Sequence, residues 1–270
     1  MNDSKLSRAL HTARKMFGHF VRARFWRGHG VHSPYVYHIV RHVISAKIGN
    51  ATCAKLADTY RHSTLSDKTV VDSSKNIGAR KDDIGQTTVE AIAHRTAISR
   101  KVGHMLGRLV ADAKANGVIE LGTSTGISTA YLAAYCPEAT VVSIEAGKIG
   151  YVAEKRLKEL GIDNVSVVHA MIDDELDKAI ESLPNGMVDF AFVDANHTYE
   201  ATIRYKDKIV EHCAERCTIV FDDIYWSKGM TRAWQEIVSD SRIMTTIELC
   251  GMGIAVVRTG CQKEHYMVRW

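Results

Sequence analysis

Hydrophobic and polar residues follow one another along the chain in two different rhythms. Up to about residue 105, apolar residues such as Leu6, Leu10, Phe17 and Val21 recur at the spacing of an amphipathic helix, and glycine or proline separates one such stretch from the next. From Asn116 onward, short apolar runs alternate with longer amphipathic stretches. The pattern therefore predicts a helical N-terminal segment followed by regularly alternating strands and helices.

The second region predicts seven strands and five helices. The expected strands are Val118–Leu121, Thr140–Ile144, Val165–His169, Val188–Val193, Thr218–Phe221, Met244–Glu248 and Ile254–Val257. The expected helices are Ser128–Tyr135, Lys148–Leu160, Asp174–Ser182, Tyr199–Glu211 and Lys228–Ser239. Alternation at this length predicts an α/β fold with a Rossmann-like, doubly wound, mostly parallel seven-stranded sheet. Because the last two strands follow each other closely, we expect the last one to be antiparallel.

The N-terminal region predicts helices and loops. Ser33 and Pro34 form a helix entry, with the helix body over Val36–Ala46, and a further helix is expected over Thr96–Ala115. The polar stretch Ser63–Gln86 predicts a mobile loop. We therefore expect a helical N-terminal extension over residues 1–95 and a second domain over residues 96–270.

The charge of the chain is unevenly distributed. The net charge is only +4, but residues 4–57 contain no Asp or Glu, ten Lys or Arg, and six of the thirteen His. Such a basic segment either attracts nucleic acid, anionic lipid or acidic substrates, or is simply a solvated helix face. No apolar run approaches the ~18 residues of a membrane span, and the six Cys show no C-x-x-C pairing. We expect a cytoplasmic protein with reduced thiols.

A glycine-containing turn follows the first strand of the alternating region. The strand Val118–Leu121 leads into Gly122-Thr-Ser-Thr-Gly126, and glycine lets the backbone approach a ligand closely. Glu145 follows Gly122 by 23 positions, near the spacing at which a carboxylate accepts hydrogen bonds from ribose hydroxyls. This combination predicts a nucleotide-like ligand, although an ordinary turn between a strand and a helix is the alternative.

The residues of this turn favour one class of ligand. Ser124 occupies the middle position at which a dinucleotide site has glycine, and the turn lacks the lysine of a P-loop. Glu120 would lie poorly beside a pyrophosphate but well beside a cationic amino or sulfonium group. We therefore expect S-adenosylmethionine as the cofactor.

From about Thr96 to Val257 the chain resembles the class I S-adenosylmethionine-dependent methyltransferases. It is similar in particular to small-molecule O-methyltransferases, including catechol O-methyltransferase, and to bacterial relatives of unassigned substrate; Glu120–Gly126 matches the cofactor motif and Ser143–Glu145 the ribose motif. The resemblance implies a cofactor site of Glu120, Gly122, Thr123, Ser124, Gly126, Ser128, Glu145, Ala146, Met171 and Asp194, with His169 and Ala170 also bordering the adenine.

Acidic residues follow two later strands. Asp194 ends one strand and Asp222-Asp223 the next, and we expect both ends at the same edge of the sheet as the glycine turn. Three neighbouring carboxylates repel one another without a cation, and oxygen ligands suit Mg²⁺ or Ca²⁺. The resemblance implies that Asp194, Asp222 and Asp223 bind Mg²⁺ or another divalent cation. It also places His197 where the family commonly has a lysine base, so His197 and Asp194 are the expected catalytic residues. Helix capping by the aspartates and a structural role for His197 are the alternatives.

The favoured function is O-methylation of a small hydroxylated molecule. One alternative is an RNA or protein methyltransferase that uses the basic segment Lys5–Arg41, although no Asn-Pro-Pro-Tyr motif follows the fourth strand. Another is a protein that binds S-adenosylmethionine without catalysis, and a homodimer stays open. The glycine pattern argues against a nicotinamide-dependent dehydrogenase. The methyl acceptor is not identified by the sequence.

Overall fold

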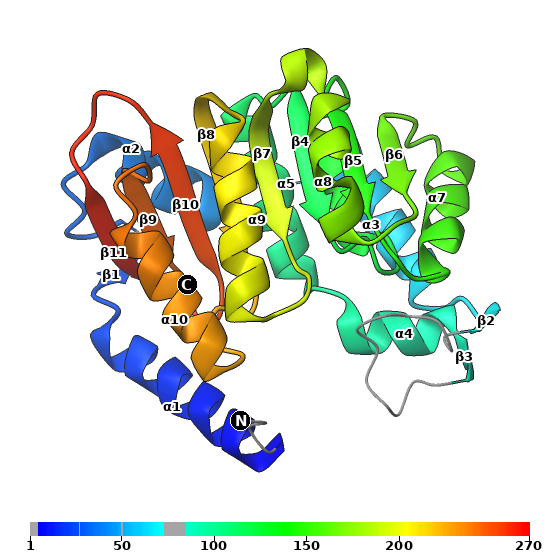
Figure 1. Ribbon diagram of the computed structural model, residues 1–270, viewed down its shortest axis with the longest axis horizontal. Coiled ribbons are helices and arrows are strands. Elements are labelled where there is room, and N and C mark those ends of the chain that lie inside the picture. Colours follow the sequence, from blue (N-terminus) through cyan, green and yellow to red (C-terminus); the bar gives the residue numbers. More distant parts are fainter. Residues whose placement is uncertain (1–4, 27, 50, 73–84) are drawn as a thin grey trace. The chain divides into compact units, whose positions relative to one another are not determined.

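The computed structural model describes residues 5–26, 28–49, 51–72 and 85–270 (Figure 1). The chain forms two compact units. The central unit comprises residues 47–188, and the terminal unit comprises residues 1–46 and 189–270. These units divide the chain differently from the boundary expected at residue 95, which stays a prediction.

The central unit contains a parallel sheet of three strands in the order β4-β5-β6. Its elements are α3 (Thr52–Thr64), β2 (Val70–Asp72), β3 (Gln86–Thr88), α4 (Val89–Thr96), α5 (Arg100–Ala113), β4 (Gly117–Leu121), α6 (Ile127–Tyr135), β5 (Thr140–Ile144), α7 (Ile149–Glu159), β6 (Val165–Val168), α8 (Ile172–Glu181) and a short 3₁₀ turn (Pro184–Gly186). Every residue of β4 is buried, and so are the first eight residues of α6. The buried strand and helix hold the turn between them in a fixed position, because close-packed interiors resist small shifts.

The terminal unit contains six strands in the order β1-β11-β9-β10-β8-β7. Its elements are α1 (Lys5–Arg22), β1 (Phe25–Trp26), α2 (Pro34–His38) continuing as a π-helix (Ile39–Ile44), β7 (Val188–Val193, which begins at the unit boundary), α9 (Tyr199–Glu211), β8 (Cys213–Phe221), α10 (Lys228–Ser239), β9 (Thr245–Glu248), β10 (Gly253–Arg258) and β11 (Glu264–Arg269). β10 is antiparallel to β8 and β9, whereas β11 is parallel to β9 and β1.

The predicted α/β class is confirmed, and so is the antiparallel strand at Ile254–Val257. The described residues nevertheless form a sheet of nine strands, and not seven, in addition to the separate β2–β3 pair. The sequence analysis missed β1, which has two residues, and β11. In β11 the buried residues Tyr266 and Val268 alternate with more exposed ones, so its signal was present but weak.

Two expectations for the N-terminal region need correction. The helix expected over Thr96–Ala115 is interrupted: α4 ends at Thr96, and α5 starts after Ser99, whose hydroxyl accepts a hydrogen bond from the Val102 N–H as an N-cap. The loop expected over Ser63–Gln86 lies partly outside the described residues. Of its described residues, Ser63 and Thr64 end α3, Val70–Asp72 form β2 and Gln86 begins β3, and β2 and β3 pair in antiparallel fashion.

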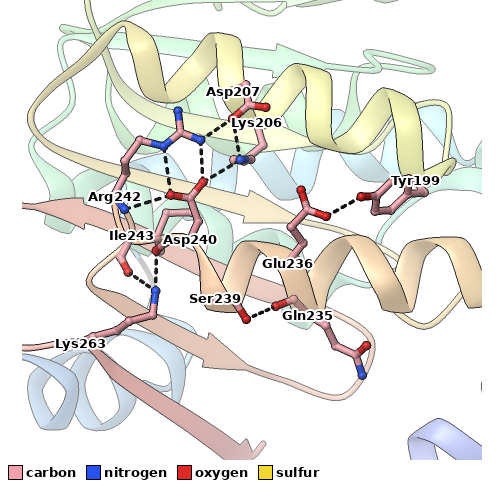
Figure 2. Close-up of polar contacts among 10 residues, drawn as sticks. All are labelled: Tyr199, Lys206, Asp207, Gln235, Glu236, Ser239, Asp240, Arg242, Ile243 and Lys263. Carbon is pink, nitrogen blue, oxygen red and sulfur yellow. Dashed lines mark hydrogen bonds and ion pairs between the residues drawn. The ribbon is translucent and has the colours of Figure 1, made fainter.

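An ion network around the buried Lys206 joins α9 to the residues after α10 (Figure 2). The Lys206 side chain is only 3% exposed, and its ammonium lies 2.6 Å from Asp207 Oδ1 and 2.7 Å from Asp240 Oδ2. Arg242 donates to both carboxylates. The hydrogen bonds from Arg242 lower the pKa of Asp240 below its usual value, although burial acts against them. The network fixes the end of α10 onto α9.

Replacing Asp240 with alanine is expected to lower the free energy of unfolding by about 2 kcal/mol, because the buried Lys206 loses one of its two carboxylate partners and keeps Asp207. Since the folded-state pKa of Asp240 is lowered, its stabilisation is present above the unfolded pKa of about 3.9 and is lost as the pH falls through the folded value. Urea unfolding of wild type and Asp240→Asn is therefore measured from pH 7 down to pH 2. The difference between their free energies of unfolding should become smaller below about pH 4. Lys155→Ala, at an exposed pair with Glu159, serves as the near-neutral control. A difference in the free energy of unfolding that does not change with pH would contradict stabilisation by the ionised Asp240 side chain.

Candidate functional site

The glycine turn after β4 has an unusual backbone. Gly122, Ser124 and Gly126 all have positive φ, at 101°, 46° and 77°. Gly126 is also the N-cap residue of α6. A positive φ at a residue other than glycine costs about 1–3 kcal/mol, so the conformation at Ser124 is maintained only by its surroundings. Backbone strain of this kind is concentrated at ligand-binding loops.

The side chain of Tyr60 in α3 packs against this turn. Its buried hydroxyl donates to the Thr125 carbonyl at 2.9 Å. A Cβ placed on Gly126 would lie 2.4 Å from the Tyr60 oxygen and 3.0 Å from the Ala153 Cβ. Glycine is thus required at 126 both by the dihedral angle and by the close approach of Tyr60. The sequence analysis placed Tyr60 in the N-terminal extension and missed this contact.

Glu145 connects the end of β5 to the glycine turn. Its carboxylate accepts from the Ser124 N–H at 2.8 Å and from the Gly147 N–H at 2.7 Å. These bonds fix the carboxylate beside the turn. Each of its oxygens has further capacity to accept a hydrogen bond, as a ribose diol requires. The predicted pairing of the ribose motif with the turn therefore exists in the structure, and ribose binding by Glu145 stays a prediction.

Glu120, the last but one residue of β4, is fully buried. Burial raises its pKa to about 7, although hydroxyl groups that donate to the carboxylate lower it in part. The donors to Oε2 are Thr129 at 2.5 Å and Ser143 at 2.6 Å. Among the described residues, Oε1 has no hydrogen-bond partner. A buried carboxylate oxygen without a partner is costly, so this atom fits a cationic donor brought by a ligand.

Residues near the end of β6 form an aromatic pair. The rings of His169 and Tyr151 stack at 3.6 Å between centroids with an angle of 14° between their planes. His169 Nε2 lies 2.9 Å from Glu154 Oε2, while its buried Nδ1 has no partner within the described part of the chain. Tyr151 is 59% exposed, which leaves ring surface available to a planar ligand. Sequence reasoning found His169 but missed Tyr151.

The other predicted cofactor residues of the central unit lie on the same loops and helix ends. Ser128 and Thr123 are buried, whereas Ala146 and Met171 are partly exposed, and Met171 is the N-cap residue of α8. Thr123 Oγ1 lies 2.5 Å from Ser143 Oγ, which in turn donates to Glu120. The central unit thus brings the predicted glycine turn and ribose motif together.

In the terminal unit, Asp194 and His197 lie in the loop that follows β7. His197 Nε2 is 3.5 Å from Asp194 Oδ1, and the His197 ring centroid is 6.3 Å from that of Trp226. Asn196 and His197 have positive φ, at 64° and 37°. The loop is thus strained at the residue expected to act as a base. A carboxylate beside an imidazole can orient the ring and stabilise the imidazolium that forms when it takes up a proton.

Asp222 and Asp223 follow β8. The Asp222 N–H donates to the Val193 carbonyl at 3.0 Å, which joins the end of β8 to the end of β7. The Asp222 side chain accepts from the Asp223 N–H at 2.8 Å, and Asp223 has a φ of 53°. Burial, together with the nearby carboxylates of Asp194 and Asp223, raises the pKa of Asp222 to about 8. The three aspartates are therefore near one another, as predicted.

Metal binding by these three aspartates stays a prediction. Across the described ranges, no group of three or more His, Cys, Asp or Glu side chains is arranged to hold a metal ion. The physical reason lies in the directions of the side chains, since Asp222 accepts from its own loop and Asp194 faces His197. The sequence predicted that the three aspartates lie close together at the strand ends. It did not predict the directions in which their side chains point.

Comparison with known proteins shows what part of the chain is similar to. Residues 119–224 match the family described as a methyltransferase domain. Over 126 residues the chain is 31% identical to a protein-L-isoaspartate O-methyltransferase of Alcanivorax borkumensis, and the match covers 43% of this chain and 56% of the relative. The chain thus spans about half the length of that relative.

Solved structures agree on the fold. The cofactor-bound protein Rv0187 from MTB has a TM-score of 0.56 at 22% identity, with 81% of this chain and 95% of that chain covered. The O-methyltransferase from Bacillus cereus in complex with SAH has a TM-score of 0.57 at 18% identity, covering 81% and 96%. The expected Rossmann-like α/β fold is therefore confirmed, and residues 119–224 match a family described as a methyltransferase domain.

Proposed function

We propose that this chain, which carries a methyltransferase domain over residues 119–224, transfers a methyl group from S-adenosylmethionine to an oxygen of a small hydroxylated molecule. The observation that carries the proposal is the buried Glu120 carboxylate beside the glycine turn, whose Oε1 has no partner among the described residues. An ammonium group is the donor that such an atom lacks. The neighbours bound to SAH or to a cofactor support the same ligand class.

Each part of the cofactor has a residue suited to it. Glu120 would accept from the amino group, and Glu145 would accept from the ribose hydroxyls while its bonds to Ser124 and Gly147 hold it in place. The exposed ring of Tyr151, stacked on His169, would lie against the adenine. When bound, S-adenosylmethionine supplies an electrophilic methyl group on its sulfonium. The protein contributes mainly by positioning, which can supply several kcal/mol of the barrier reduction.

His197 is proposed as the base that takes the proton of the acceptor hydroxyl. Histidine is the side chain that most often serves as a general base, and Asp194 at 3.5 Å would stabilise the imidazolium that results. Asp194 acts through His197 and is a positioning residue in this scheme. Trp226, whose ring lies 6.3 Å from that of His197, would form one wall beside the base.

A second candidate is methylation of a carboxylate on a protein. The observation in its favour is the 31% identity to a protein-L-isoaspartate O-methyltransferase. A carboxylate is already deprotonated at neutral pH, so its methylation needs no base. The two candidates therefore differ in whether His197 is required.

The test is a transfer assay with S-adenosylmethionine labelled on its methyl group. Arms with a cell metabolite extract, an isoaspartyl peptide and RNA are each run with Mg²⁺ and with EDTA. We expect label in small hydroxylated molecules. Label in the peptide alone would favour the second candidate, and label in RNA would overturn both. Activity lost in EDTA and restored by Mg²⁺ would show that the reaction requires a divalent metal.

A further inference from the structure

Helix α1 has one face docked on the terminal unit. His11 Nε2 lies 2.9 Å from Thr231 Oγ1 in α10, and the Thr12 hydroxyl donates to the Tyr225 carbonyl at 3.0 Å. His19 is buried, with one ring nitrogen 3.2 Å from Glu248 Oε1 and the other 3.1 Å from the Val268 carbonyl. These contacts come from the same side of the helix, because positions 12 and 19 are two turns apart. They hold α1 against the unit in a defined orientation (Figure 1).

The opposite face of α1 is apolar and exposed. Its large apolar side chains and their exposed fractions are Leu6 (81%), Leu10 (71%), Phe17 (71%), Phe20 (54%) and Val21 (66%). At 100° per residue these positions fall within an arc of about 100°, so they form one continuous stripe. We call these five residues the outer stripe. Isolated exposed apolar residues are ordinary on protein surfaces, but a continuous stripe of this kind marks an interaction surface.

The charge on α1 limits what covers the outer stripe. The helix carries Lys5, Arg8, Arg14, Lys15 and Arg22 and has no acidic residue. Arg269 adds a further cation, 3.8 Å from the centre of the Phe20 ring. A second copy of the chain packed on the stripe would bring two such helices together, and their like charges would repel. Nucleic acid would neutralise the cations but would leave the apolar side chains in water.

We propose that α1 is an interfacial helix that binds an anionic lipid surface, with the outer stripe inserted among the acyl chains and the cations beside the stripe, such as Arg14 and Arg269, against the headgroups. A helix with Phe and Leu on one face, Lys and Arg around it and no acidic residue has the composition of such helices. Each cation near an anionic surface adds to the attraction, which salt weakens. Binding would be peripheral, since no helix in the described part of the chain is long and apolar enough to cross a membrane. The proposal stands independently of methyl transfer.

Lipid binding would take place next to a loop of the candidate site. The Thr12 hydroxyl contacts the backbone of Tyr225, and the Arg8 guanidinium lies 5.6 Å from the centre of the Trp226 ring. Both aromatic residues belong to the loop that begins with Asp222 and Asp223. The helix that contacts lipid is therefore the one that supports this loop.

The experiment is co-sedimentation of the full chain with vesicles of phosphatidylcholine alone or with one quarter phosphatidylglycerol. We expect binding to the anionic vesicles that is at least ten-fold stronger than to neutral ones and that falls with added salt. The double variant Leu10→Glu/Phe17→Glu should lose at least ten-fold in partitioning, and Arg14→Gln/Lys15→Gln should lose a smaller factor while keeping the stripe. Both sites are at the surface, so circular dichroism and thermal unfolding should match the wild type. Val70→Glu, at a residue 58% exposed in β2, is the matched control and should bind as the wild type does.

Several outcomes would overturn the proposal. These are no binding to anionic vesicles, binding that the Leu10→Glu/Phe17→Glu variant keeps, and a concentration-dependent dimer in ultracentrifugation that this variant abolishes. Tighter binding to a short RNA than to the vesicles, unaffected by the stripe variant, would also overturn it.

Discussion

Replacing His197 with alanine is expected to lower kcat for a hydroxyl acceptor by about 10²–10⁴-fold, the usual contribution of a general base. The affinity for S-adenosylmethionine should stay unchanged, because none of the cofactor contacts proposed here involves the imidazole. Asp194→Ala should also abolish most of the activity with the fold intact, since it removes the carboxylate 3.5 Å from His197 Nε2. Steady-state kinetics with an acceptor found by the labelling screen, together with a binding titration for the cofactor, check both parts.

The pH profile separates a base from a structural residue. In His197→Ala the rate should rise with pH well above neutrality, because more of the acceptor hydroxyl ionises without help, and added imidazole should restore part of it. His212→Ala is the matched control, since His212 caps α9 in the same unit and bonds to the Lys208 carbonyl. An unchanged kcat in His197→Ala would remove the base from the mechanism.

Replacing Gly126 with alanine is expected to weaken S-adenosylmethionine binding by about 30- to 1,000-fold. The new Cβ would lie 2.4 Å from the Tyr60 hydroxyl, and overpacking of this kind costs about 1–3 kcal/mol. The φ of 77° adds about 1 kcal/mol for a residue with a side chain. Together the two costs amount to about 2–4 kcal/mol, and 1.4 kcal/mol corresponds to a factor of ten in Kd. The affinity falls by this amount if the turn shifts to relieve the strain.

Two further variants isolate the cause. Gly126→Ala/Tyr60→Phe removes the oxygen that the Cβ would meet, so it should recover part of the affinity for S-adenosylmethionine. The part of the affinity that is lost because alanine disfavours a positive φ should not be recovered. Gly161→Ala has a similar φ of 70° but nothing within 4 Å of its Cβ, so it should cost stability and leave the affinity unchanged. Equal affinity of Gly126→Ala and wild type would show that the turn does not hold the cofactor.

The parts of the site predicted from sequence are those encoded locally. A buried strand that ends in Gly122 to Gly126, and a carboxylate at Glu145 after the next strand, depend only on spacing and on the β-α-β order, and the structure joins them through the Ser124 N–H. Helices α9 and α10 are likewise encoded by local sequence patterns, and their predicted bounds agree with the structure.

The parts that were missed depend on segments far apart in the chain. Tyr60 contacts a turn 65 residues later, and nothing in the pattern around it indicates which turn it meets. Asn, His and Asp are enriched at positive φ, but residue type alone does not show that Asn196, His197 and Asp223 adopt it, because the surrounding structure imposes it. Strand ends predicted that Asp194 and Asp222 would be close, but the directions of their side chains depend on hydrogen bonds within each loop.

Isothermal titration calorimetry of the full chain with S-adenosylmethionine tests most directly whether the glycine turn is a cofactor site. We expect one site per chain, with a Kd of about 1–100 μM, or roughly −5 to −8 kcal/mol. Binding should weaken by about 30- to 1,000-fold in Gly126→Ala. It should also weaken in Glu145→Ala, which removes the carboxylate bound to the Ser124 and Gly147 N–H groups. No binding to the wild-type protein, or equal binding to all three proteins, would contradict the assignment of this turn.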